Sequence, residues 1–275
     1  MKCSVRTLAA TGVVVLLTAV AVITMLPSAA AASGRKQEST TTTEESTSTP
    51  QASTSTTVGS TSSANAPSNP ACTPSVFAQA QQLVQTELTG RIVQLQQLSS
   101  EVANTANYLT PSDRQALEND IDGFELPGIE ALKTQTEQAT TCAQLRDDAH
   151  SMVFTYRVYL VMTPQTHLTI VADNETDIEN LLSSLEPTIN SAIEKAQTNG
   201  ANVSGSEVAF KELKTLVAAA QDETSGLSAQ LLAQTPAGSP GNWQVFLQAR
   251  TNLTTAHNDL HSAYADALQV KADLS

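Results

Sequence analysis

The sequence predicts an all-α fold, an elongated antiparallel helical bundle, and three observations support this prediction. From about residue 75 to the C-terminus, apolar residues recur three or four positions apart nearly everywhere, which is the spacing of one helix face. Proline, glycine and helix-capping residues divide this pattern into long segments. Alanine and aliphatic residues supply most of the apolar content, with only 4% aromatic residues, which suits helices that approach closely.

The N-terminus predicts export. Residues 8–26 form a nearly unbroken apolar run after Lys2 and Arg6, and small residues follow Pro27. This order is typical of a secretory signal peptide, here residues 1–32. The run is also close to the roughly 20 residues that span a bilayer, so an uncleaved anchor is the alternative. In both cases we expect the C-terminal body to be extracellular or at the cell surface.

Residues 33–71 are rich in Ser and Thr and contain almost no large apolar side chains. Such a segment cannot bury enough surface to offset its conformational entropy, so we expect a disordered stalk. The composition suits either a passive linker or O-glycosylation. The helical domain would then cover residues 72–275.

Charge and cysteine content restrict the partners and the compartment. Removing residues 1–32 takes away two of the 14 basic residues and none of the 27 acidic ones, which leaves a net charge of −15. A domain this acidic repels phosphate backbones and anionic lipids, so neither nucleic acid nor a membrane surface is an expected partner. Without Cys3, the remaining thiols are Cys72 and Cys142, and an oxidising compartment favours a disulfide between them. Two buried free thiols are the alternative.

Two antiparallel helices open the predicted domain. The first covers residues 75–109 and the second residues 111–138, with Thr110 as N-cap and Pro111 in the first turn. We expect Phe124 to face inward and Pro127 to kink the second helix. This hairpin would bring the start of its first helix, with Cys72, beside Cys142.

A long middle helix is predicted over residues 141–198, with residues 152–162 as the most buried stretch. Residues 156–171 are also rich in β-branched and aromatic side chains, so a hairpin is the alternative there. Two further helices are predicted over residues 206–234 and 242–274. Because the middle helix is long enough to serve two bundles, we expect two three-helix bundles that share it. One compact bundle of five or six helices is the other possibility.

A resemblance supports the helical prediction. The central block contains Phe154, Tyr156-Arg157-Val158-Tyr159, Pro164, His167-Leu168 and Ala172-Asp173, and residues 232–236 read Leu-x-x-Thr-Pro. In these residues the chain resembles uncharacterised exported bacterial helical-bundle proteins, over roughly residues 75–275 and most densely at 154–173. The resemblance implies helix instead of hairpin at 156–171 and a bacterial source, and it implies no activity.

Motifs with recognisable chemistry are absent or incomplete. His257 and His261 are four residues apart on one predicted helix, but Asn258 stands where a metalloprotease has glutamate. Residues 118–123 are similar to half of an EF-hand loop, yet the register then requires glutamate at position 129, which is Ile129. We therefore predict no catalytic residues, no metal and no cofactor.

Polar groups in the central block need partners. Arg157 and His167 lie in an apolar helix, so we expect a buried Arg157–carboxylate pair and a hydrogen-bonded His167. The speculative alternative is a ligand site formed by Tyr156, Arg157, Tyr159 and His167.

The sequence therefore predicts a non-catalytic exported or surface-displayed module that binds an unknown protein or cell-wall polymer. The alternative is a carrier of a small or lipidic ligand between helices, which a sizeable cavity would favour. An enzyme is the least favoured class.

Overall fold

A computed structural model describes residues 72–275 of the chain. The predicted signal peptide or anchor (residues 1–32) and the predicted stalk (residues 33–71) lie outside these described residues. All regular secondary structure between Cys72 and Ser275 is helical, which confirms the all-α prediction. No helix in this part of the chain has both the length and the apolar character needed to cross a membrane.

The first helices begin where the sequence predicts. Thr73 and Thr110 each accept a hydrogen bond from a backbone N–H of the first turn, and Thr141 forms a capping box with Gln144. The elements are α2 (Pro74–Asn104), α3 (Pro111–Glu118), the π-helical segment η2 (Asn119–Glu125), α4 (Leu126–Gln138) and α5 (Cys142–Ser151).

Two details of this first half differ from the prediction. Helix α2 ends at Asn104, several residues before Leu109. The irregularity predicted at Pro127 begins earlier, at Asn119, and Pro127 lies in the first turn of α4, which continues η2 without a break. Because each π turn takes an extra residue, the apolar face shifts, and Phe124 is 61% exposed instead of buried.

The predicted middle helix is not continuous. It consists of α5, the π-helical segments η3 (Met152–Tyr156) and η4 (Val158–Met162), and α6 (Thr163–Thr198). Between η3 and η4, Arg157 adopts a left-handed conformation with φ 43° and ψ 38°. The region is helical, so the hairpin alternative is wrong. The prediction that residues 152–162 are the most buried is also wrong, because Phe154, Tyr159 and Leu160 are exposed and the most buried stretch of α6 begins at Gln165.

The second half contains α7 (Ser204–Thr224), α8 (Leu227–Leu232), the short η5 (Pro236–Gly238) and α9 (Asn242–Asp273). Gly226, with φ 69°, provides the left-handed residue that separates α7 from α8. The seam predicted along the last helix is confirmed, and its buried apolar residues are Phe246, Ala249, Leu253, Ala256, Leu260, Ala263 and Val270.

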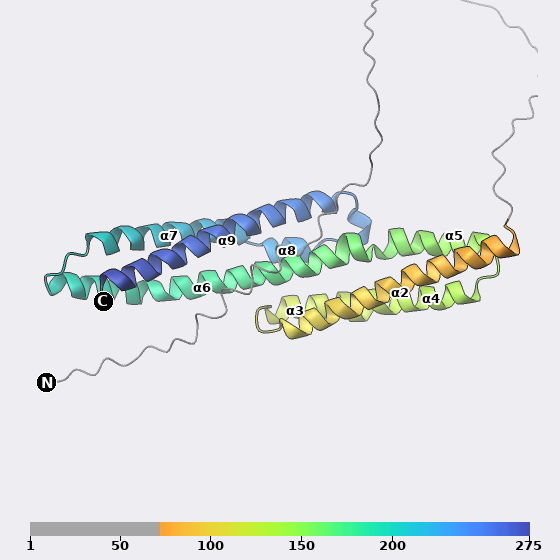
Figure 1. Ribbon diagram of the computed structural model, residues 1–275, viewed down its shortest axis with the longest axis horizontal. Coiled ribbons are helices and arrows are strands. Elements are labelled where there is room, and N and C mark those ends of the chain that lie inside the picture. Colours follow the sequence, from red (N-terminus) through yellow and green to blue (C-terminus); the bar gives the residue numbers. More distant parts are fainter. Residues whose placement is uncertain (1–71) are drawn as a thin grey trace, which may run out of the picture. The chain divides into compact units, whose positions relative to one another are not determined.

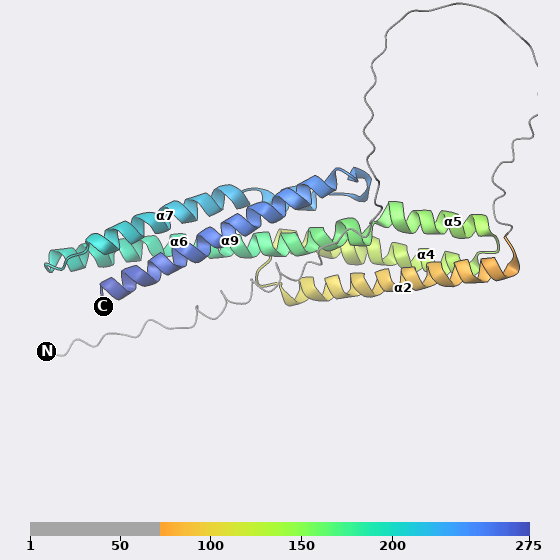
Figure 2. The same cartoon turned by 45° about the horizontal axis from the view of Figure 1, so that its top comes forward.

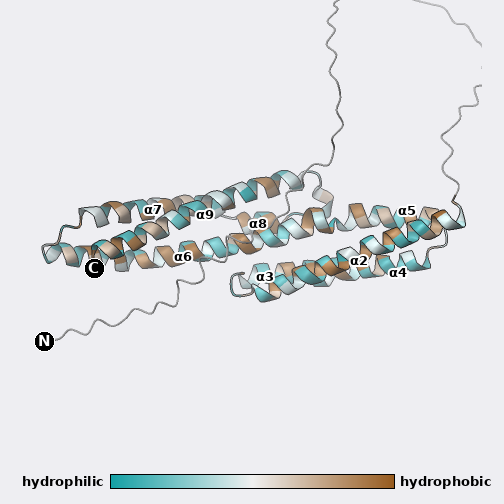
Figure 3. Cartoon of the chain, in the orientation of Figure 1, coloured by the Kyte–Doolittle hydropathy of each residue, from teal (hydrophilic) through white to brown (hydrophobic). Residues whose placement is uncertain are grey.

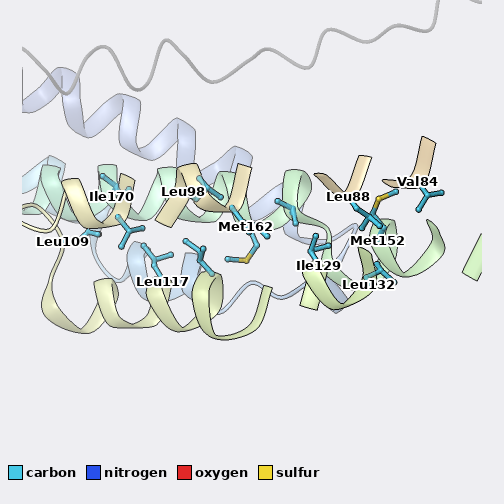
Figure 4. Packing of buried hydrophobic residues seen from close by; sticks show 14 residues of the cluster. Val84, Leu88, Leu98, Leu109, Leu117, Ile129, Leu132, Met152, Met162 and Ile170 are labelled. Atoms are coloured by element: carbon cyan, nitrogen blue, oxygen red, sulfur yellow. The ribbon is translucent and has the colours of Figure 1, made fainter. Parts of the chain in front are cut away.

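Helices α2, α4 and α5 pack together, and α6, α7 and α9 pack together (Figure 1), an arrangement that is also visible in the second view (Figure 2). Hydrophobic and hydrophilic residues alternate along each of these helices (Figure 3). Figure 4 shows the core of the first group, in which Met162 and Ile170 join side chains of α2, α3 and α4. Val161 and Leu168 instead pack against α8 and α9. The stretch from η4 into α6 is therefore buried from two sides.

Cys72 and Cys142 lie at disulfide distance, with 6.2 Å between their Cα atoms. This agrees with the predicted pair. Cys72 lies two residues before α2 and Cys142 is the first residue of α5, and they meet because the α2–α4 hairpin returns the chain to its own starting point.

Candidate functional site

A pocket of about 410 Å³ lies between η2, the η3–η4 segment, α6, α8 and η5. Its apolar wall comes from Phe124, Met162, Leu232, Pro236 and Ala237. Its polar lining comes from Asp120, Glu125, Thr155, Gln165, Gln234 and Thr235. Residues more than 100 positions apart in the sequence thus form one mostly apolar concavity with a few polar groups, as is typical of small-molecule sites.

Glu125 is the most unusual residue of this pocket. Its side chain is 2% exposed, and its Oε2 atom has no hydrogen-bond partner. Burial, with a smaller contribution from the nearby Asp120 charge, raises the pKa of Glu125 to about 8. Burial also raises the pKa of Asp120. Glu125 is therefore largely a neutral carboxylic acid at pH 7.

Gln165 supplies a second unmatched acceptor. This residue is 1% exposed, and its Nε2 donates to the backbone carbonyls of Leu231, Leu232 and Gln234 at 3.1, 3.1 and 3.2 Å. These bonds satisfy carbonyls at the C-terminal end of α8 and hold it against the first turn of α6. The Oε1 atom of Gln165 is buried and has no partner.

Irregular backbone surrounds the pocket. Asp120, Phe124 and Glu125 belong to η2, Thr155 to η3 and Met162 to η4. Single π turns inside α-helices are frequent at functional sites, because they redirect side chains away from the regular helix face. Thus η2 carries an exposed phenyl ring and a buried carboxyl into the same pocket.

Arg157 fixes the backbone beside the pocket. Its Nη1 donates to Ser239 Oγ at 2.8 Å and its Nε to the Phe154 carbonyl at 3.2 Å. Its guanidinium also lies over the Phe154 ring, 5.2 Å from the centroid. The left-handed Arg157 thus links the η3–η4 junction to the residue after η5. Within residues 72–275 these contacts engage the guanidinium, and the predicted Arg157–carboxylate pair is not formed there.

The four residues of the alternative ligand site contact different elements. The ring of Tyr156 occupies the space that a side chain at Gly128 would need, and Arg91 of α2 lies 4.9 Å from the centroid of the Tyr159 ring. His167 Nε2 is 3.0 Å from Glu101 Oε2, which agrees with the expected hydrogen-bonded histidine. None of the four lines the 410 Å³ pocket. A ligand site formed by Tyr156, Arg157, Tyr159 and His167 stays a prediction.

A second buried polar group lies between α6 and α9. His257 Nδ1 is 3.0 Å from Oε1 of Glu175, which is fully buried. The hydrogen bond with Glu175 raises the pKa of His257. His261, one turn later on α9, is exposed. Within residues 72–275, no cluster of three or more histidine, cysteine, aspartate or glutamate side chains is arranged to hold a metal ion.

Sequence reasoning missed Glu125 and Gln165, although a signal for one of them was present. Leu117, Ile121 and Ile129 form a regular buried series with a spacing of four, and Glu125 occupies the missing place in that series. A carboxyl on an apolar seam either requires a partner or has a function. The contribution of α8 and η5 to the pocket could not be predicted from the sequence, because it depends on tertiary packing.

Searches of protein-family models, curated proteins and solved structures give no match to this chain. The resemblance to exported helical-bundle proteins therefore stays a prediction.

Proposed function

We propose that residues 72–275 form a non-catalytic module that binds a small ligand in the pocket between η2, α6 and η5. The observation that carries this proposal is a mostly apolar pocket whose lining includes Glu125 and Gln165, two nearly fully buried polar residues that each have an acceptor atom without a partner. Its size falls within the range of about 300–1,000 Å³ that is usual for small-molecule sites. The proposal follows the carrier alternative of the sequence analysis.

An unsatisfied buried polar group costs about 1–3 kcal/mol, so two such residues in the lining of one pocket favour a ligand that brings hydrogen-bonding groups to them. The titratable lining residues among the described part of the chain are Asp120 and Glu125. Both have raised pKa values because they are buried. Among the described residues, the pocket lining contains no histidine and no cysteine.

Export and architecture complete the proposal. We infer that residues 1–32 direct or anchor the chain outside the cytoplasm and that residues 33–71 separate the module from the membrane or cell wall. The Cys72–Cys142 pair supports an oxidising compartment. The contacts of α2, α4 and α5, and those of α6, α7 and α9, support two three-helix bundles joined through the α5–α6 segment.

Binding of a protein or cell-envelope polymer is the second candidate. It is favoured by the exposed side chains of Phe154, Tyr159 and Leu160 on consecutive turns of η3 and η4. Exposed apolar side chains that cluster on one segment are typical of interaction surfaces.

A pocket-filling substitution separates the two candidates. The neutral fluorophore phenylnaphthylamine should bind the full-length chain with increased emission, and Ala237→Trp should abolish this binding because it fills the cavity. Ala233→Trp is the matched control, since Ala233 is an exposed alanine of the same segment that does not line the pocket. Equal binding by both variants, or no binding by the native chain, would contradict the small-ligand proposal.

A further inference from the structure

We propose that the ligand of this pocket is an organic cation, a protonated amine attached to an apolar body. This inference rests on the proposed small-ligand function and specifies the chemistry of the ligand.

Several hydrogen-bond acceptors of the lining residues have no partner. Glu125 Oε2 and Gln165 Oε1 are buried acceptors without partners, and the Asp120 carboxyl adds further acceptor capacity. The two side-chain amides of the lining are already engaged, because Gln165 Nε2 is bonded to three carbonyls and Gln234 Nε2 donates to the Gln230 carbonyl at 2.8 Å, while the hydroxyls of Thr155 and Thr235 also line the pocket. An ammonium group has three donors and no acceptor, so it is complementary to these acceptors.

The charges of the lining favour the same ligand. Within residues 72–275, neither Asp120 nor Glu125 forms a salt bridge. The guanidinium of Arg157 is engaged by Ser239 and the Phe154 carbonyl instead. An ammonium ion bound beside these carboxyls would favour their ionised forms, because it supplies the missing opposite charge. The exposed ring of Phe124, also in the lining, can contribute a cation–π contact.

The apolar wall suits the rest of such a ligand. Met162, Leu232 and Pro236 are apolar residues of the pocket lining. A free metal ion would gain nothing from these groups and would require more oxygen ligands than two carboxyls and one amide supply. The combination of carboxyl groups and apolar side chains in one lining therefore favours an amphiphilic amine.

Binding should be linked to proton release. The empty pocket holds Glu125 largely protonated at pH 7, since its pKa is about 8, whereas a bound ammonium favours the carboxylate. Burial is the main cause of this raised pKa, and the Asp120 charge on the same segment adds to it. The neighbouring elements bring no charge, since their lining residues are Gln165 of α6, Thr155 of η3, Leu232 of α8 and Pro236 of η5. The affinity for an amine should then increase as the pH is raised toward 8, by up to about tenfold per pH unit.

Three compounds with the same ring test the charge of the ligand: benzylamine, benzyl alcohol and benzoate. Their affinities for the full-length chain are measured at pH 6, 7 and 8 by ligand-observed NMR titration. Benzylamine should bind about tenfold or more tightly than the alcohol at pH 8, because charge-assisted hydrogen bonds are the stronger ones. Benzoate should bind least.

Glu125→Gln keeps the size of the side chain and removes its charge. It should weaken benzylamine binding by about tenfold and abolish the pH dependence, while benzyl alcohol binding changes by less than about twofold. Glu130→Gln, at an exposed position of α4, is the matched control and should change neither. Asp120→Asn is a second variant, on a partly exposed residue, and should weaken benzylamine binding in the same direction.

The outcomes distinguish this inference from the proposed function. If phenylnaphthylamine binds in the pocket but the alcohol or benzoate binds as tightly as the amine, the cation inference is overturned and the small-ligand proposal stands. The cation inference is also overturned if the affinity for benzylamine increases as the pH falls, because a protonated Glu125 would then be acting as the donor. Failure of phenylnaphthylamine and of all three ring compounds to bind overturns both.

Discussion

Polar residues placed on apolar helix seams distinguish this bundle at the scale of single residues. Glu125 continues the buried series of Ile121 and Ile129, and Glu175 is fully buried on α6. Glu175 has a partner in His257, whereas Glu125 has none among the described residues. Because an unpaired buried carboxyl destabilises a fold, Glu125 is the residue whose retention is best explained by function.

Glu125→Gln should stabilise the protein, and more so at pH 8 than at pH 5. The folded chain holds the Glu125 proton up to about pH 8, whereas the unfolded chain releases it near the ordinary pKa of about 4.3. The stability contributed by this proton is therefore fully present below the unfolded pKa and is lost as the pH rises through 8, by up to about 1.4 kcal/mol per unit. Glutamine does not titrate, so the variant escapes this loss.

Urea unfolding of both proteins at pH 5 and pH 8 measures the difference. Glu130→Gln, on the exposed face of α4, should show no such change. Burial also raises the pKa values of Asp173 and Glu179. The free energy of unfolding of Glu125→Gln should therefore still depend on pH, but less steeply than that of the native chain. A stability difference that is the same at both pH values would contradict the raised pKa.

At the scale of elements, the segment between α5 and α6 explains where the helical prediction failed. Residues 152–162 are almost continuously apolar, so their sequence marks no single face. The structure resolves this ambiguity with two π-helical segments and a left-handed Arg157. Val158 and Met162 consequently point into the first core, whereas Val161 joins α8 and α9.

The left-handed conformation of Arg157 predicts that glycine at this position gives a more stable protein than alanine, the reverse of the order in a regular helix. Arg157→Gly and Arg157→Ala lose the same contacts with Ser239 and Phe154, but only alanine has a Cβ atom that crowds the backbone at φ 43°. The glycine variant should therefore be more stable than the alanine variant by about 0.5–1 kcal/mol.

Thermal unfolding of the two variants gives this comparison directly. The matched pair is Ser184→Gly and Ser184→Ala, at an exposed position inside α6. There alanine should be the more stable by about 1 kcal/mol, because the backbone is regular helix. If alanine is also preferred at position 157, the backbone there is not left-handed.

At the scale of the whole described chain, the Cys72–Cys142 pair closes the first hairpin. A bond between these residues encloses a sequence separation of 70. In the chain-entropy treatment such a loop restricts the unfolded state by roughly 4 kcal/mol. The hairpin is the part of the bundle that supplies Asp120, Phe124 and Glu125 to the pocket, so the bond also supports the site.

Reduction should therefore lower stability and ligand binding together. Urea unfolding with and without a thiol reductant should show a lower midpoint on reduction, and the Cys72→Ser/Cys142→Ser double variant should match the reduced chain. Peptide mapping without reductant should recover the two cysteines in one linked species. Free thiols in the exported protein, or a midpoint insensitive to reductant, would contradict this prediction.

The sequence by itself determined the helical class, the starts of the first helices, the cysteine pair and the seam of α9. These features depend on local capping residues and on one regular apolar face, as for Thr110, Thr141 and Leu260. Only the tertiary structure decided the pocket, because its lining joins η2, α6 and η5, and the sequence pattern of each element is independent of the others. The interruption at Arg157 was decided in the same way, since a run that is apolar on every side is compatible with several registers until both neighbouring cores are in place.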